Sequence, residues 1–273
     1  MFEEPYRWVE AVGNRRQYLD DQLKQGSPII GASYEDGILL LSFSRGTPKL
    51  YEIYDQIGLG GMGHPADLEK LRFSLLDMAH MEGFQRSPGD VTGSRLVKYG
   101  LAPVIKQAFE EIFKAPYIMK VLLAELGHHS QQDRFFTIDY DGGFEESTIF
   151  SCVVASNHIQ ALMATYFKSL GSDNLASLPV VLEQAIKTWG VGLWHQTQED
   201  HEEASSSDET EKDTSSENGP TEDEIVECLR NALAEKTLEC VTLDRTLPGT
   251  SKYHRLSSEA VTALLPSALQ GVK

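Results

Sequence analysis

Residues 29–44 read IIGASYEDGILLLSFS, and this stretch decides the fold. Two largely apolar runs, 29–34 and 38–44, flank Glu35, Asp36 and Gly37. An Asp-Gly pair between two such runs is a strong signal for a tight turn that joins antiparallel strands. The stretch therefore predicts a β-hairpin.

A second pair of short strands is predicted over 49–54 and 57–62, separated by Asp55 and Gln56. Glycines crowd the second of them at Gly58, Gly60, Gly61 and Gly63. This cluster has neither the Gly-Lys-Ser/Thr end of a phosphate-binding loop nor the spacing of a dinucleotide fingerprint. We predict instead that the glycines allow close backbone packing where a strand meets a helix.

The remaining chain alternates blocks of strands with pairs of helices. Helices are expected over 4–25, 65–82, 90–114, 159–170, 178–189, 222–234 and 257–269, and further strands over 118–125, 134–140, 148–155, 238–244 and 253–256. This is not the strict alternation of a parallel sheet. The predicted fold class is α+β, a four-layer α-β-β-α sandwich in which helix pairs cover two stacked antiparallel sheets.

The chain of 273 residues carries 24 basic and 41 acidic side chains, a formal net charge of −17. Such a negative surface repels phosphate backbones, so no nucleic-acid partner is expected. The segment 199–224 holds twelve acidic residues against Lys212, a net charge of −11, which leaves −6 for the rest. It contains no large apolar residue, so we predict a disordered acidic insertion: either a tolerated surface insertion, which we favour, or an arm for a basic partner.

No apolar run approaches the roughly 18 residues that a membrane span needs. Glu3 and Glu4 precede any apolar stretch, so no secretory signal is visible and a cytoplasmic location is predicted. Metal ligation and cofactor binding are not predicted. Cysteines 152, 228 and 240 form no ligand pattern, His128 and His129 lack ligand partners at suitable spacing, and 156–158 (Ser-Asn-His) is interpreted as a turn and helix cap.

Lys49 begins a strand whose neighbours are apolar. A lysine in this position can extend its stem to solvent. It can also present one positive charge in a pocket, either to bind a carboxylate or to tune a nucleophile. The pattern alone does not choose between these roles.

Four stretches resemble bacterial 20S proteasome subunits of the α type. They are 49–58 (KLYEIYDQIG), 90–96 (DVTGSRL), 134–142 (RFFTIDYDG) and 238–265. The resemblance covers roughly 5–190 and 236–265. It implies the α-β-β-α sandwich of N-terminal nucleophile (Ntn) hydrolases, which agrees with the predicted order of elements.

Proteasome subunits have two roles. In β-type subunits a propeptide is removed and the new N-terminal threonine attacks the peptide bond, helped by a lysine and an aspartate. Subunits of the α type are inactive, form the outer seven-membered rings on the β-type rings, and control the entry of unfolded proteins. A lysine between adjacent α subunits receives the C-terminal carboxylate of an activator, commonly a ring ATPase.

The resemblance divides the chain into a gate segment with a ring-contact helix (1–26), the sandwich domain (27–198 and 225–273) and the acidic insertion (199–224). It implies that Val9, Val12 and Tyr18 face neighbouring subunits and that the residues before Tyr6 lie near the pore.

By position, Lys49 matches both the catalytic lysine of β-type chains and the activator-binding lysine of α-type chains. The nucleophile position falls near Ser27, which Pro28 follows, and the aspartate position falls near Phe43. Phenylalanine cannot hold a lysine or shift its pKa. We therefore predict no catalytic residue and a carboxylate-binding Lys49. Two alternatives stay open: a self-processed hydrolase with Ser27 as nucleophile and Lys49 as its tuner, and a ring-forming homologue without a protease partner.

Overall fold

The structure is a computed structural model, and it describes residues 4–111, 113–171, 175–205, 219–265 and 269. Within these residues the strands form two five-stranded antiparallel sheets, of order β10-β9-β2-β1-β8 and β3-β4-β5-β6-β7. The predicted sandwich of two antiparallel sheets is confirmed.

The first sheet is built around the predicted hairpin. Its strands are β1 (Ile29–Tyr34), β2 (Gly37–Ser44), β8 (Phe150–Val153), β9 (Thr237–Asp244) and β10 (Tyr253–Arg255). Tyr34 pairs with Gly37, so the turn consists of Glu35 and Asp36. The predicted hairpin is confirmed, and its turn is one residue shorter than the predicted 35–37, because Gly37 already pairs in β2.

The second sheet contains β3 (Leu50–Tyr54), β4 (Ile57–Gly63), β5 (Met119–Glu125), β6 (Arg134–Ile138) and β7 (Phe144–Ser147). The edge strand β7 was not predicted. Its sequence, FEES, is exposed or half-buried at every position, so it lacks the apolar alternation that marks a strand packed on a core.

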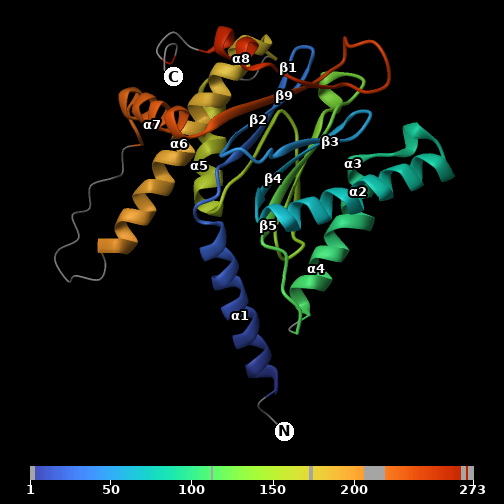
Figure 1. The fold of residues 1–273 in the computed structure, drawn as a ribbon, viewed down its shortest axis with the longest axis vertical. Helices are drawn as coiled ribbons and strands as arrows, with labels where there is room; N and C mark the ends of the chain where they lie inside the picture. Colours follow the sequence, from blue (N-terminus) through green and yellow to red (C-terminus); the bar gives the residue numbers. More distant parts are fainter. Residues whose placement is uncertain (1–3, 112, 172–174, 206–218, 266–268, 270–273) are drawn as a thin grey trace.

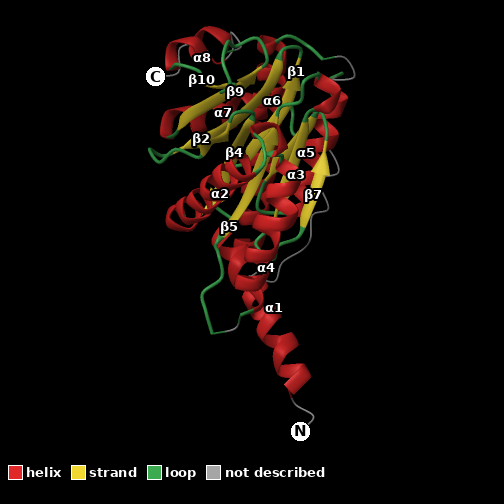
Figure 2. Ribbon diagram, turned by 90° about the vertical axis from the view of Figure 1, so that its right-hand side faces the viewer, coloured by secondary structure: helices red, strands yellow, loops and turns green. Residues whose placement is uncertain are grey.

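Helices cover the outer face of each sheet, so the four predicted layers are present (Figures 1 and 2). On the first sheet lie α5 (Asn157–Ser169), α6 (Leu178–Ser205), α7 (Glu222–Glu235) and α8 (Ser258–Leu264); on the second lie α2 (Pro65–Gln85), α3 (Gly93–Arg95) and α4 (Ala102–Glu110). Residues of β2 alternate between layers: Leu39 and Leu41 face the helices, whereas Ile38 and Leu40 face the second sheet.

The glycine cluster of β4 packs closely against its neighbours. A Cβ atom added to Gly60 would lie 2.6 Å from the Ile29 side chain of the first sheet, and one added to Gly61 would lie 2.4 Å from Leu68 of α2. The prediction of close packing is confirmed at Gly61, and Gly60 shows that the cluster also brings the two sheets together.

Helix α1 (Glu4–Leu23) lies below the sandwich, and its C-terminal end enters the core between the sheets (Figure 1). Leu19 and Leu23 are fully buried there. Arg15 Nη1 donates hydrogen bonds to the carbonyl oxygens of Phe109 at 2.7 Å and Glu111 at 3.0 Å. These carbonyls belong to the last turn of α4, whose groups have no partner within the helix. The opposite half of α1 projects from the body.

Three predicted helices have different bounds. The expected helix 90–114 is a turn of α3, a π-helical segment (Leu96–Leu101) and α4, which ends at Glu110. The expected helix 257–269 is described only over α8, and Ser257 is its N-cap residue. Helix α6 continues from the predicted end at 189 to Ser205.

The margins of the acidic insertion are helical, which corrects the prediction of disorder over 199–224. Helix α6 covers the first residues of the insertion, and α7 begins at Glu222 with Thr221 and Glu224 forming a capping box. Glutamate is a good helix former, and acidic side chains stabilise a helix N-terminus, so local propensity prevailed over charge repulsion. Residues 206–218 lie outside the described part.

Replacing Leu19 with alanine tests whether α1 is part of the core. Because Leu19 is fully buried between the sheets, Leu19→Ala should lower the free energy of unfolding by about 3 kcal/mol, as measured by urea denaturation. The matched control is Gln22→Ala, an exposed position on the same helix, which should change stability by less than about 0.5 kcal/mol. Equal effects of the two substitutions would contradict this packing.

Candidate functional site

Lys49 lies at the end of the sandwich that α1 approaches. It leads into β3, and its backbone is fixed on two sides: its N–H donates to Glu239 Oε2 at 3.1 Å, and its C=O accepts from Gly61 N at 3.0 Å. The side chain is half-buried. Within the described part of the chain, Lys49 Nζ makes no hydrogen bond and no ion pair.

The surroundings of Lys49 disfavour its charge. Burial, followed by the positive charge of Lys236, lowers the pKa of Lys49 to about 8, although the Glu239 carboxylate acts in the opposite direction. Arg45 adds a smaller lowering effect. At neutral pH the lysine is therefore still a cation, but one that is only weakly compensated. Such a group favours the approach of an anion.

No hydrogen bond joins Ser27 to Lys49 in the described part of the chain. It follows α1, precedes β1 and is 6% exposed. Its Oγ accepts a hydrogen bond from Lys236 Nζ at 3.2 Å. The carbonyl of Gly26 accepts from Gln196 Nε2 at 3.2 Å, so the linker between α1 and β1 is held by α6. The structure thus brings Ser27 together with a lysine that the sequence analysis did not single out.

An aromatic pair occupies the region of Phe43, the position at which catalytic β-type subunits have an aspartate. The rings of Phe43 and Trp189 are tilted by 33°, with centroids 3.9 Å apart, and both side chains are fully buried. Trp189 Nε1 and Ser42 Oγ each donate to the Pro28 carbonyl at 2.9 Å. Because Phe43 is buried against a ring and carries no carboxylate, it cannot orient or activate Lys49.

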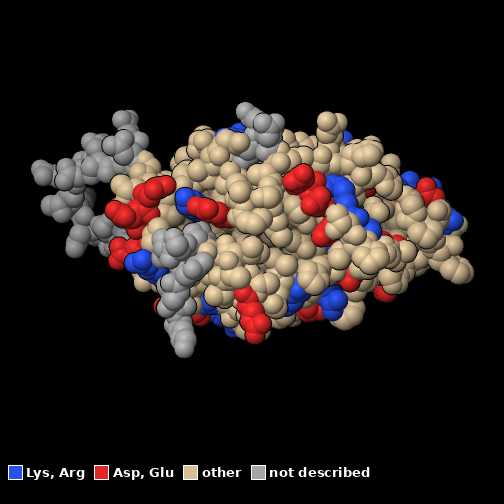
Figure 3. Space-filling view, turned by 90° about the horizontal axis from the view of Figure 1, so that it is seen from above, with Lys and Arg blue, Asp and Glu red and all other residues tan. Residues whose placement is uncertain are grey.

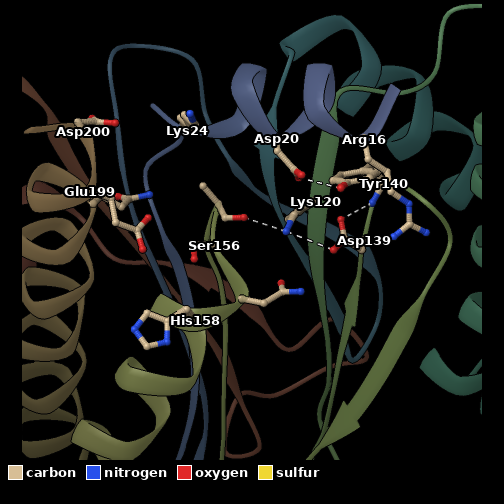
Figure 4. Close-up of a pocket in the computed structure, with 13 residues that line it drawn as sticks. Arg16, Asp20, Lys24, Lys120, Asp139, Tyr140, Ser156, His158, Glu199 and Asp200 are labelled. Atoms are coloured by element: carbon tan, nitrogen blue, oxygen red, sulfur yellow. Dashed lines mark hydrogen bonds and ion pairs between the residues drawn. The ribbon is translucent and has the colours of Figure 1, made fainter. Parts of the chain in front are cut away.

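A separate polar cavity of about 490 Å³ lies between α1, the ends of β5 and β6, and helices α5 and α6 (Figure 4). Lys120, 5% exposed, projects toward it and contacts the Ala155 carbonyl at 3.0 Å and Asp139 Oδ2 at 3.2 Å. Tyr140 donates to Asp20 of α1 at 2.7 Å. These contacts satisfy Lys120 and tie α1 to the second sheet. The sequence analysis did not identify Lys120. The signal that could have done so is a single lysine within the otherwise apolar strand MKVLLAE.

The other predicted residues lie apart from Lys49. Ser156 is the N-cap residue of α5, as predicted, and it lines the polar cavity with His158. His128 lines a cavity of about 340 Å³ beside Glu125. In the described residues, no group of three or more His, Cys, Asp or Glu side chains has an arrangement that could hold a metal ion. All three cysteines are free thiols.

Acidic and basic side chains are interspersed over the described residues of the face opposite α1 (Figure 3). Among the described helices, none has the length and apolar character required to cross a membrane.

Two antiparallel sheets between helical layers, with a glycine-rich strand packed against the hairpin sheet, define the proteasome and Ntn-hydrolase sandwich class.

No protein-family model matches the chain. The chain is similar to curated proteins called "proteasome subunit alpha". It is 28% identical to that of Actinosynnema mirum over 67% of this chain and 68% of the relative. It is 28% identical to that of a Parafrankia species over 53% and 60%. With that of Mycolicibacterium vanbaalenii it is 26% identical over 94% and 87%. The predicted resemblance to bacterial proteasome α-type subunits is therefore confirmed.

Burial and neighbouring positive charges disfavour the charged form of Lys49. We therefore expect that removing this charge stabilises the isolated chain. Its pKa is about 8 in the folded state and close to 10.5 in the unfolded state, so folding is penalised while the lysine is charged. The penalty is complete below pH 8 and disappears as pH rises toward 10.5. Lys49→Met should therefore raise the free energy of unfolding by about 1 kcal/mol at pH 7, with a smaller gain at pH 10.

The control for this measurement is Lys106→Met, which removes an exposed lysine that is paired with Glu110 at 2.8 Å. This variant should show no gain in denaturation experiments at either pH. A loss of stability in Lys49→Met at pH 7, or a gain that does not decrease at pH 10, would contradict the electrostatic description of Lys49.

Proposed function

We propose that this chain is a non-catalytic α-type subunit of a bacterial 20S proteasome core particle in the cytoplasm. It forms a homo-oligomeric, heptameric outer ring, stacks on β-type subunits, controls the entry of unfolded proteins and docks an activator such as a ring ATPase. The observation that carries the proposal is the position of α1, whose Leu19 and Leu23 fill the open end of the sandwich ahead of Ser27. The similarity to proteins called proteasome subunit alpha supports it.

The exposed half of α1 supports ring formation. Trp8, Val9 and Tyr18 are 47%, 65% and 50% exposed, an apolar surface that a neighbouring copy would cover. Val12 is half-buried and also packs against the core of its own chain. Of the proposed gate segment, residues 1–3 lie outside the described part, and Glu4 already belongs to α1.

Lys49 supports the docking of an activator. A C-terminal carboxylate would supply the negative charge that this half-buried ammonium group lacks, through a charge-assisted hydrogen bond. Lys49 immediately precedes β3, and hydrogen bonds of its backbone N–H and C=O hold it in place. Its position therefore does not depend on a contact between its side chain and a carboxylate.

Degradation of an unfolded substrate by the reconstituted particle tests this function. The chain is co-expressed with a β-type subunit and a ring ATPase of a bacterial proteasome. Lys49→Ala should abolish stimulation by the ATPase while leaving ring assembly, measured by size-exclusion chromatography, intact. Lys106→Ala, an exposed control on α4, should leave both unchanged. Unchanged stimulation in Lys49→Ala would contradict the docking role, and a chain that never co-purifies with a β-type subunit would support the ring-forming homologue.

One observation favours the alternative hydrolase. Ser27 Oγ and Lys236 Nζ are 3.2 Å apart, which is hydrogen-bonding distance for a nucleophile and its base. Ser27 is, however, 6% exposed and joined to α1 through Gly26. Peptide hydrolysis by the purified chain alone separates the two functions. We expect no activity; hydrolysis that Ser27→Ala abolishes would establish the hydrolase.

A further inference from the structure

Strand β7 leaves one edge of the second sheet open. On one side it pairs with β6, from Phe144 opposite Ile138 to Ser147 opposite Phe135. Among the described residues no strand pairs with its other side, and β7 lies at the margin of the molecule (Figure 2). An open strand edge presents unpaired N–H and C=O groups with which another chain can pair.

The hydrogen-bond pattern of the β6–β7 pair identifies the backbone groups on the open edge. Just before β7 begins, Asp139 donates its N–H to the Gly143 carbonyl at 2.8 Å. Bonded and non-bonded pairs alternate along an antiparallel ladder, so the backbone groups of Glu145 point toward β6. Those of Phe144 and Glu146 therefore point outward.

A groove runs along β7 on the side that faces the first sheet. It consists of two cavities of about 560 and 570 Å³, which are continuous because they share Thr137, Glu145, Gln160 and Ala164. Strands β6 and β7 form one wall and helix α5 forms the other, and residues of β8 also line it. Side chains alternate between the two faces of a strand, so a chain paired with β7 would place every second side chain in this groove.

The turn after β7 carries the chain from the second sheet to the first. Ile149 lies in this turn with a φ of 69°, a left-handed conformation that a β-branched residue rarely adopts. Its carbonyl accepts from Ser33 N at 2.7 Å, which fixes the turn to β1. Strained positions of this kind concentrate at binding sites. Ile149 is 44% exposed and Phe144 is 40% exposed, so an apolar side chain is available at each end of β7.

The groove is acidic. Its lining residues include four acidic side chains but only two lysines, Lys120 and Lys168. Glu145 lines both cavities and has no ion pair within the described part of the chain. A lysine or arginine of a bound chain would supply the missing positive charge. The other three acidic residues are already paired: Asp139 with Lys120, Asp141 with Arg16, and Glu146 with Arg134.

We propose that β7 and the groove beside it form a docking site for an extended, basic peptide segment of a partner protein, which adds to the five-stranded second sheet as a further strand. The outward N–H and C=O groups of Phe144 and Glu146 bind the backbone of the segment, and Glu145 binds a basic side chain. Charge disfavours a second copy that pairs β7 with β7, because two FEES strands would bring like charges together. The site includes neither Lys49 nor Ser27 and does not rest on the proposed function.

Binding of short peptides to the full-length chain tests strand addition, with fluorescence anisotropy as the measurement. The probe is the peptide VKVKV with a neutral dye at its N-terminus and an amide at its C-terminus, so that it carries no free carboxylate. The control peptide VEVEV reverses the charge. Two N-methylated forms of the probe, one methylated at the valines and one at the lysines, each block one edge of the peptide backbone. We expect VEVEV to bind at least tenfold more weakly, and only one of the two methylated forms to lose binding.

Two substitutions at Phe144 isolate the open edge of β7. Phe144→Pro and Phe144→Ala both remove the ring, but only proline removes the outward N–H. Because that N–H is not part of the ladder to β6, the strand itself should be retained. Phe144→Pro should bind the probe about fivefold more weakly than Phe144→Ala.

A substitution at Glu145 tests the charge of the groove. Glu145→Gln should weaken binding of the probe about threefold, whereas Glu259→Gln, at an exposed position of α8, should leave it unchanged. Equal binding of VKVKV and VEVEV would overturn the recognition of a basic segment. Equal affinities of the proline and alanine variants, or loss of binding by both or neither of the methylated forms, would overturn strand addition. If no peptide binds and Phe144→Pro instead changes the oligomeric state in size-exclusion chromatography, the edge is an interface between copies and the proposal is overturned.

Discussion

The burial of the C-terminal end of α1 between the two sheets is the constraint on which the rest of the structure depends. Leu19 and Leu23 are fully buried there, and each such side chain contributes roughly 1.5–3 kcal/mol of hydrophobic stabilisation. Arg15 fastens the same helix to the end of α4, and the Tyr140–Asp20 hydrogen bond fastens it to β6. Ser27 therefore follows a helix whose C-terminal end lies in the core, and it precedes β1.

This constraint decides what the end of the sandwich can do. With α1 in place, Ser27 is a buried hydroxyl in the middle of a chain, and the Phe43–Trp189 pair fills the space beside it. The positively charged side chain of Lys49 remains partly accessible. Lys49 is half-buried and makes no ion pair in the described residues, and we propose that it binds an anion. The same fold class can thus hold a nucleophile or, as proposed here, a docking site.

Much of the architecture could be predicted from local patterns, because hairpin turns and apolar periodicity depend on residues that are close together in the sequence. The Asp36-Gly37 signal identified the central hairpin, and the glycines of β4 were interpreted correctly as packing residues. Local patterns failed where tertiary contacts decide: β7 is a polar edge strand, and the π-helical segment places Gly100 against Met78. The Ser27–Lys236 contact joins residues 209 positions apart, so no motif or spacing could have revealed it.

Intact-mass spectrometry tests whether α1 stays attached and whether Ser27 is inactive. The purified chain is first incubated with an electrophilic probe that reacts with N-terminal serine and threonine nucleophiles. We expect an unmodified chain that retains α1, because the end of this helix is buried in the core ahead of Ser27. A species that begins at Ser27 and carries the probe would contradict it, because it would mean that α1 is a removable segment covering an active hydrolase.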